Sequence, residues 1–289
     1  MSEEGVQASA HSLAEVVATM ADIMGSSEDA RDLLSLMHDK PRHWTLTSHG
    51  VLRDADAAVA RRAAERVAAG EPMQYAAGRA AFRHLTLNVD QRVLIPRPET
   101  EVLVDIVLGL TKEGEGGTAV DVGTGSGAIA IALASEGNFA RVIGTDISAD
   151  ALAVARTNGE RAGTSCQATL EFRQGSLLGP VPERGLRAVV SNPPYISFEE
   201  AEALPALVRD WEPSVALFSG ANGLATTAEL IREAGAALAP GGVLAIEVDV
   251  RRASTVAELA ATHPAYEDVR VLLDLTGRER FVVARRREE

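Results

Sequence analysis

The chain contains almost no cysteine and no concentration of histidines. Cys166 is its only cysteine, which excludes an internal disulfide and is typical of a protein of the reducing cytoplasm. None of the six histidines stands at metal-ligand spacing from Cys166. His38, His43 and His49 gather only loosely, so the sequence predicts no metal site.

Long apolar runs are also missing. No stretch stays apolar over the roughly 20 residues that a membrane helix needs, so we expect no membrane span. The first residues, MSEEGVQASAHSLAEVV, have no basic stretch before an apolar one, and we expect no secretory signal. The hydrophobic content of 46% is typical of a globular chain with a sizeable core.

The chain has no excess of positive charge. Its formal charge is −13, with −4 in residues 1–90 (13 acidic, 9 basic) and −9 in residues 91–289 (28 acidic, 19 basic). Proteins that bind nucleic acid usually present lysine and arginine to the phosphates. The charge therefore argues against a nucleic-acid substrate, although a local basic patch is compatible with an acidic sum.

Residues 1–79 are dominated by helical patterns. Apolar residues recur at helical spacing in SLAEVVATMADIM, SSEDARDLLSLM and DADAAVARRAAERVAAG, and no strand pattern separates them. This region is predicted to be a small all-helical domain. Residues 80–98 contain the alternating stretch LTLNVDQRVLI followed by PRPET, which predicts a hairpin connector.

Strand and helix patterns alternate from residue 99 to residue 289. Such alternation is typical of an α/β domain, in which a parallel sheet lies between helices. The last segment, VRVLLDLTGRERFVVARR, reads as two strands around Gly277. The sequence therefore predicts a parallel sheet that ends in a C-terminal antiparallel hairpin.

The stretch DVGTGSGA follows the first predicted strand of the α/β domain and opens a helix. Its glycines allow a sharp turn and a close approach of a ligand to the backbone. Asp146 ends the next strand, where a carboxylate can bind both hydroxyls of a ribose. The glycine spacing also fits a dinucleotide. Asp121, however, would oppose a pyrophosphate and favours the cationic end of S-adenosylmethionine.

The stretch VVSNPPYIS ends the fourth predicted strand, on the same sheet edge as the glycine loop. Pro193 and Pro194 fix the backbone, so the Asn192 side-chain oxygen and the Pro193 carbonyl can act as paired acceptors. This pair suits a planar –NH2 group, and Tyr195 offers a ring for stacking. Glutamine, adenine and guanine all carry such a group, so the turn alone does not choose among them.

These segments together resemble the glutamine methyltransferases that act on peptide chain release factors, the HemK/PrmC family. The resemblance covers nearly the whole chain. Its segments are GEPMQYAAGRAAF (70–82), VLIPRPETEVLVD (93–105), DVGTGSGAIAIALA (121–134), SNPPYI (191–196), EPSVALFSGANGL (212–224) and LDLTGRERF (273–281). NPPY is shared with adenine-DNA and guanine-RNA methyltransferases, whereas IPRPETE joined to NPPY is more specific to the glutamine enzymes.

The resemblance implies a Rossmann-like S-adenosylmethionine-dependent methyltransferase sheet and a methyl acceptor in the Gly-Gly-Gln tip of release factors. It implies that residues 1–79 grip the release factor. The implied cofactor-binding residues are Gly123, Thr124, Gly125, Ser126, Gly127, Asp146, Ser176, Leu177 and Asn192. The implied substrate-binding residues are Arg97, Glu99, Asn192, Pro193, Pro194 and Tyr195, of which Asn192, Pro193 and Tyr195 are the catalytic ones.

Two positions depart from the family pattern. Ser176 stands where the family has an Asp that accepts from the adenine amino group, and Asp249 replaces the Gly of Glu-x-Gly. Several alternatives remain open. A base methyltransferase for DNA or RNA and a glutamine methyltransferase for a ribosomal protein share NPPY. A dinucleotide oxidoreductase and an inactive binding partner are further readings.

Overall fold

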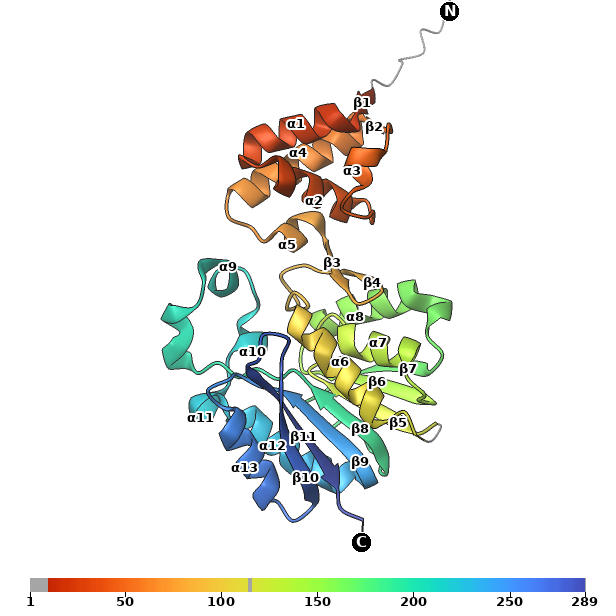
Figure 1. Cartoon of the computed structure of the whole chain (residues 1–289), viewed down its shortest axis with the longest axis vertical. Helices are drawn as coiled ribbons and strands as arrows, with labels where there is room; N and C mark the ends of the chain where they lie inside the picture. Colours follow the sequence, from red (N-terminus) through yellow and green to blue (C-terminus); the bar gives the residue numbers. More distant parts are fainter. Residues whose placement is uncertain (1–9, 114–115, 289) are drawn as a thin grey trace, which may run out of the picture. The chain divides into compact units, whose positions relative to one another are not determined.

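The structure is a computed structural model that describes residues 10–113 and 116–288. The chain divides into two compact units, Met1–Ala81 and Phe82–Glu289 (Figure 1). The first nine residues of the predicted range 1–79 lie outside the described part, as does the start of the stretch read for a secretory signal. No helix within the described ranges is long and apolar enough to cross a membrane.

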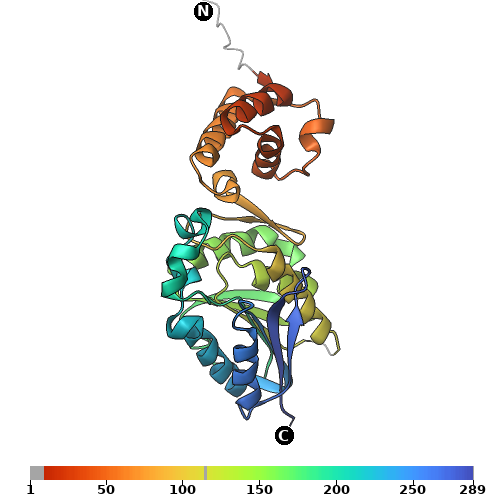
Figure 2. The ribbon, with the colours of Figure 1, turned by 60° about the vertical axis from the view of Figure 1, so that its left-hand side comes forward.

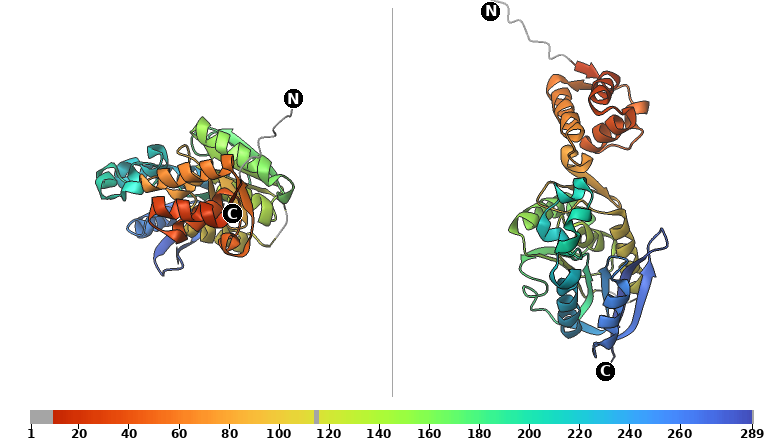
Figure 3. Two further views of the ribbon diagram at one scale, coloured as in Figure 1. Left: turned by 90° about the horizontal axis from the view of Figure 1, so that it is seen from above. Right: turned by 90° about the vertical axis from the view of Figure 1, so that its left-hand side faces the viewer.

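The first unit is a helical bundle around its own core (Figure 3, right, red to orange). Its helices are α1 (Leu13–Met24), α2 (Ser27–Met37), α3 (Trp44–Thr47), α4 (Asp54–Ala68) and α5 (Met73–Ala77). Ser12 caps α1 in a capping box with Glu15, and Ser26 caps α2. Met20, Leu33 and Leu34 are wholly buried among these helices, because each presents one apolar face inward.

A short antiparallel pair accompanies the helices, although no strand is predicted in this region. Strands β1 (Ala10–Ser12) and β2 (Val51–Arg53) pair with Ala10 opposite Arg53. Three residues are too few to display an alternating pattern, so the sequence gives no sign of this pair.

The hairpin is present, but only one of its two strands lies within LTLNVDQRVLI. Its strands are β3 (Arg79–Phe82) and β4 (Leu85–Asn88), and the second half of LTLNVDQRVLI forms no strand. The PRPET stretch does more than break the hairpin, because Pro98 begins the unpredicted helix α6 (Pro98–Leu110). Proline suits the first turn of a helix, where its missing N–H has no partner to lose.

The second unit contains a seven-stranded mixed sheet, which confirms the predicted α/β architecture with its C-terminal antiparallel hairpin. The strands are β5 (Thr118–Val122), β6 (Arg141–Asp146), β7 (Thr169–Gln174), β8 (Leu186–Ser191), β9 (Leu238–Glu247), β10 (Tyr266–Leu273) and β11 (Glu279–Arg286). Their spatial order is β10-β11-β9-β8-β5-β6-β7 (Figure 1). Neighbours from β7 to β9 are parallel, whereas β11 is antiparallel to both β9 and β10.

Helices cover both faces of this sheet, because its strands are apolar on both sides. The helices are α6, α7 (Ala128–Glu136) and α8 (Ala149–Ala162) on one face, and α12 (Ala225–Ala237) and α13 (Ala253–Thr262) on the other (Figure 2). In β8, Ala188 and Val190 join the first core while Val189 joins the second. This alternation is the two-residue period of a strand.

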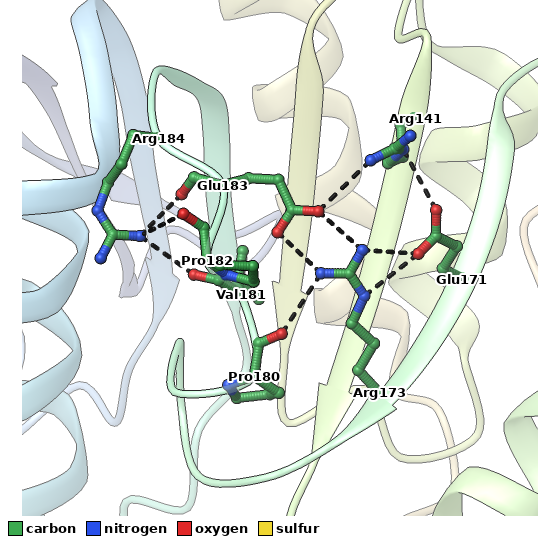
Figure 4. A network of polar contacts seen from close by, with 8 residues as sticks. All are labelled: Arg141, Glu171, Arg173, Pro180, Val181, Pro182, Glu183 and Arg184. Carbon is green, nitrogen blue, oxygen red and sulfur yellow. Dashed lines mark hydrogen bonds and ion pairs between the residues drawn. The ribbon is translucent and has the colours of Figure 1, made fainter.

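An ion-pair network takes the place of a helix at the edge strand β7. The connection 175–185 from β7 to β8 is described throughout and contains no helix. Arg173 bridges Glu171 and Glu183, and Arg141 contacts the same two carboxylates (Figure 4). Hydrogen bonds from Arg173 lower the pKa of Glu183 to about 2. The network therefore fastens the connection across the sheet as long as Glu183 is ionised.

A run of short helices separates β8 from α12 and was not predicted. Its elements are the 3₁₀ helix η2 (Phe198–Ala203), α9 (Ala206–Arg209), α10 (Ser214–Leu217) and α11 (Gly220–Gly223). The Ile196 backbone bridges to Phe218, and the rings of Phe198 and Phe218 stack at 5.4 Å. These contacts fold the run back beside the end of β8.

We predict that Gly144→Ala destabilises the protein by about 1–3 kcal/mol, the usual cost of overpacking. A Cβ at this position in β6 would lie 2.7 Å from the Phe172 ring and 2.8 Å from Thr124 Oγ1. Gly109→Ala is the matched control, because nothing lies within 4 Å of its added Cβ near the end of α6. The control should be neutral or stabilising by up to about 1 kcal/mol. Chemical denaturation measures both, and equal stability of the two variants would contradict the packing argument.

Candidate active site

Two cavities meet at the end of β8. One, of about 280 Å³, is lined by the glycine loop, Asp146 and Ser176. The other, of about 420 Å³, is lined by Arg97, Tyr195 and Asp249 among others. The residues that line both cavities are Leu94, Asn192, Pro193 and Ala216. The Asn192–Pro193 turn thus stands between two binding spaces, an arrangement that suits transfer of a group from one ligand to another.

The glycine loop forms one wall of the first cavity. Gly123 and Gly125 have positive φ values of 73° and 53°, which favour glycine, and nothing lies within 4 Å of a Cβ built on either. Asp146 Oδ2 accepts a hydrogen bond from the Gly125 N–H at 2.9 Å, and Oδ1 accepts from Ser148 N–H at 2.9 Å. The carboxylate therefore fixes the loop and faces the same cavity.

Asp121 braces this loop from behind. It is fully buried, and its Oδ2 accepts from Thr124 Oγ1 at 2.6 Å and from the Ala130 N–H at 3.0 Å. Burial raises the pKa of Asp121 to about 7. Asp121 does not line the cavity, so it acts on a ligand there as a nearby buried group rather than by direct contact. Thr124 and Ser126 are likewise buried inside the loop.

Ser176, the first departure from the family pattern, lies at the first cavity. Ser176 is exposed and lines the cavity, and Leu177 beside it has a φ of 48°. The Leu177 carbonyl accepts from Thr145 Oγ1 at 2.8 Å, and Glu233 accepts from the Leu178 N–H at 2.9 Å. These bonds hold an unfavourable backbone conformation in place. A neutral hydroxyl is the group that position 176 offers to a ligand.

The NPPY turn is held from both ends. Ser191 Oγ donates to the Val122 carbonyl at 2.7 Å, which ties the end of β8 to β5. After the turn, the Ile196 N–H donates to the Leu217 carbonyl at 3.0 Å. Gly223 packs against the turn so closely that a Cβ would lie 2.1 Å from the Tyr195 carbonyl oxygen. The turn is therefore preorganised rather than a free loop.

Tyr195 lines the second cavity as a neutral phenol. Burial raises the pKa of Tyr195 to about 12, and the nearby Glu247 carboxylate acts in the same direction. A phenol with this pKa stays protonated near neutral pH and cannot serve as a base there. Its ring remains available for stacking, as the sequence predicts.

Arg97 and Glu99 have different surroundings. Arg97 lines the second cavity and donates to Glu212 at 2.6 and 2.7 Å, which joins PRPET to the EPSVALF segment. The Glu212 side chain is buried, and burial raises its pKa in spite of Arg97. Glu99 lines neither cavity. Its implied role in substrate binding stays a prediction.

Asp249, the second departure from the family pattern, forms ion pairs with arginines. Asp249 contacts Arg251 at 2.8 Å and Arg252 at 3.6 Å, and the same arginines contact Glu200 at 2.5 and 2.6 Å. Burial raises the pKa of Asp249, but the hydrogen bonds and charge of Arg251 outweigh it and the net shift is downward. The added carboxylate is therefore paired, and the cluster fastens η2 to the loop after β9.

Two residues of the site were missed by the sequence analysis. Thr100 and Glu247 are almost completely buried, and a hydrogen-bond chain connects both to Asn192. Burial raises the pKa of Glu247 to about 7. A signal was present, because Glu247 ends the strand next to the NPPY strand and Thr100 belongs to IPRPETE.

Comparisons with known proteins agree with this geometry. Residues 99–209 match the family model described as "Methyltransferase small domain". A methyltransferase structure from Pyrococcus furiosus has the same fold, with a TM-score of 0.54 and 19% identity over 72% of this chain and 92% of that one. This confirms the Rossmann-like methyltransferase fold.

Comparison by sequence finds relatives of higher identity than this structure. A release factor glutamine methyltransferase from Moorella thermoacetica is 44% identical over 79% of this chain and 80% of its own. A protein of the same name from Deinococcus radiodurans is 39% identical over 93% of this chain and 94% of its own. The chain therefore belongs to the release factor glutamine methyltransferase family.

Proposed function

We propose that the protein transfers the methyl group of S-adenosylmethionine to the side-chain amide nitrogen of the glutamine in the Gly-Gly-Gln tip of peptide chain release factors. The observation that carries this proposal is the position of Asn192 and Pro193 on the boundary of both cavities. The proposed location of the protein is the cytoplasm, which is in keeping with its single cysteine. The names of the relatives support the choice of substrate.

The first cavity fits S-adenosylmethionine. The open space at Gly123 and Gly125 admits the methionine end, and Asp146 suits the ribose hydroxyls. Ser176 and Leu177 line the same cavity, and their proposed role is to contact the adenine. When bound, this cofactor would supply an electrophilic methyl group on a sulfonium, and the electron pair of the broken S–CH3 bond would stay on the sulfur of the product, S-adenosylhomocysteine. Asp121 is buried behind the loop and does not line the cavity, so the choice of this cofactor over a dinucleotide is supported by the methyltransferase names of the relatives.

The acceptor nitrogen is activated by position. An amide nitrogen is a weak nucleophile, because its lone pair is delocalised into the carbonyl. Asn192 Oδ1 and the Pro193 carbonyl accept hydrogen bonds from its two N–H groups and align the nitrogen with the methyl group. These acceptors also stabilise the positive charge that develops on the nitrogen. Tyr195 stacks on the amide plane, and the proton leaves to water after transfer.

The helical unit is proposed to recognise the body of the release factor. Among the described residues, its core is made of side chains from Leu13 to Ala77, so this unit has its own hydrophobic centre. None of the described residues from 10 to 79 lines either cavity. A role in gripping the substrate protein is consistent with both observations.

The cofactor assignment predicts that Asp146→Ala weakens S-adenosylmethionine binding by about 1–3 kcal/mol, as expected for hydrogen bonds to a charged group. Asp150→Ala removes the same charge from an exposed position in the first turn of α8 and should bind normally. Isothermal titration calorimetry measures both. Equal affinities for the two variants would refute the ribose assignment.

The acceptor assignment predicts that Asn192→Ala slows methyl transfer at least about 100-fold, the scale of losing one preorganised polar contact. Asn138→Ala, at an exposed position, is the control and should be fully active. Radiolabelled transfer followed by mass spectrometry of the tip peptide locates the methyl group. Replacing the tip glutamine by Ala in the release factor should abolish labelling. Label found in DNA, RNA or a ribosomal protein instead would overturn the proposed substrate.

The recognition assignment predicts that a chain starting at Ala80 binds S-adenosylmethionine normally but methylates the intact release factor far more slowly. The cut leaves Phe82, which is buried in the core of the second unit, in place. A short peptide containing Gly-Gly-Gln is the control substrate, and both forms of the enzyme should use it equally. Full activity of the shortened chain on the intact factor would locate recognition in the second unit.

A further inference from the structure

A buried chain of hydrogen bonds runs from the NPPY turn into the interior of the second unit. Asn192 Nδ2 donates to Thr100 Oγ1 at 3.1 Å, and the Thr100 hydroxyl donates to Glu247 Oε2 at 2.7 Å. Thr100 is 4% exposed and Glu247 is 2% exposed, so water does not compete freely for these groups. Neither residue lines the two cavities. Their hydrogen bonds therefore reach a ligand only by way of Asn192, although the Glu247 charge also acts on Tyr195.

Three elements bring these residues together. Strands β8 and β9 are parallel with Ser191 opposite Ile246, so the next residues, Asn192 and Glu247, emerge side by side. Thr100 reaches them from the first turn of α6, which packs against β9. The contact thus follows from the strand register and from the proline that begins α6.

Counting hydrogens determines the orientation of the Asn192 amide. A threonine hydroxyl has one hydrogen, and an ionised carboxylate only accepts. With its hydrogen committed to Glu247, Thr100 Oγ1 offers only lone pairs to Asn192. The Asn192 –NH2 must then face Thr100, because a rotated amide would set two acceptor oxygens against each other. Its Oδ1 then lies at the other edge of the planar amide group, away from Thr100.

We propose that Thr100 and Glu247 are positioning residues that hold the Asn192 amide with its oxygen presented to the substrate –NH2. This inference rests on the proposed function, because it assigns a task to Asn192 Oδ1. Charged groups that act on Glu247 are Arg280 on β11 and Arg97 and Glu99 around the start of α6. The two arginines favour the carboxylate form, which is the form that accepts from Thr100.

The test is a double-mutant cycle between Thr100 and Asn192, measured at pH 8.5 so that Glu247 is ionised. Thr100→Val keeps the shape of the side chain and removes the hydroxyl, whereas Thr100→Ser keeps the hydroxyl. We expect Thr100→Val to lower kcat about 10-fold, the scale of one misplaced hydrogen bond. Thr100→Ser should retain most of kcat, and both should bind S-adenosylmethionine normally. In the Asn192→Ala background, Thr100→Val should cause no further loss.

Glu247→Gln is the second probe, and it keeps the inference testable if Thr100→Val fails to fold. Its amide can donate to Thr100, which frees the Thr100 hydrogen to turn toward Asn192. We expect a lower kcat in the wild-type background and no effect in the Asn192→Ala background. If Thr100→Val or Glu247→Gln lowers kcat by the same factor with and without Asn192→Ala, the residue has a structural role. This result would overturn the inference but leave the proposed function intact. A wild-type enzyme that does not label the release factor, or a fully active Asn192→Ala, would instead overturn the proposed function.

Discussion

The parallel pairing of β8 with β9 is the constraint on which the site depends. Because both strands end at the same sheet edge in register, Asn192 and Glu247 emerge together. The β5–β6 pair does the same for the glycine loop and Asp146, since Val122 lies opposite Thr145. The glycine loop, Asp146, Asn192 and Glu247 therefore all lie along one edge of one sheet. Loops bring side chains to this edge, but the strand register determines where they can meet.

Burying acids at this edge has a cost in stability. Burial raises the pKa of Asp121 and of Glu247 to about 7, so the folded protein binds a proton at these sites more tightly than the unfolded chain. Linkage then makes folding less favourable as pH rises from about 4 toward 7, because the unfolded carboxyls ionise first. The large core on both sheet faces offsets this cost. The acids are kept for what they orient, namely the glycine loop and the Asn192 amide.

The sequence predicted features that repeat or stand on a single segment. Strand alternation, the glycine loop, Asp146 at the end of its strand and the NPPY turn were all readable, because each has a local pattern. The missed features join segments far apart in the chain. Arg97 with Glu212, and Thr100 with Asn192, are 115 and 92 residues apart. Isolated polar residues in such pairs have no periodicity, and the short helices from Phe198 to Gly223 are too brief to show one.

These contacts also give a physical reason why IPRPETE and NPPY occur together. NPPY alone offers an acceptor pair to any planar –NH2, so it cannot distinguish an amide from a base. Thr100, the threonine of IPRPETE, fixes the direction of the Asn192 amide, and Arg97 of the same motif is paired with Glu212 at the second cavity. IPRPETE therefore orients the Asn192 side-chain oxygen through Thr100 and also supplies Arg97 to the wall of the second cavity. A chain with NPPY but without Thr100 would need another buried donor–acceptor group to hold Asn192, and its second cavity would have a different wall.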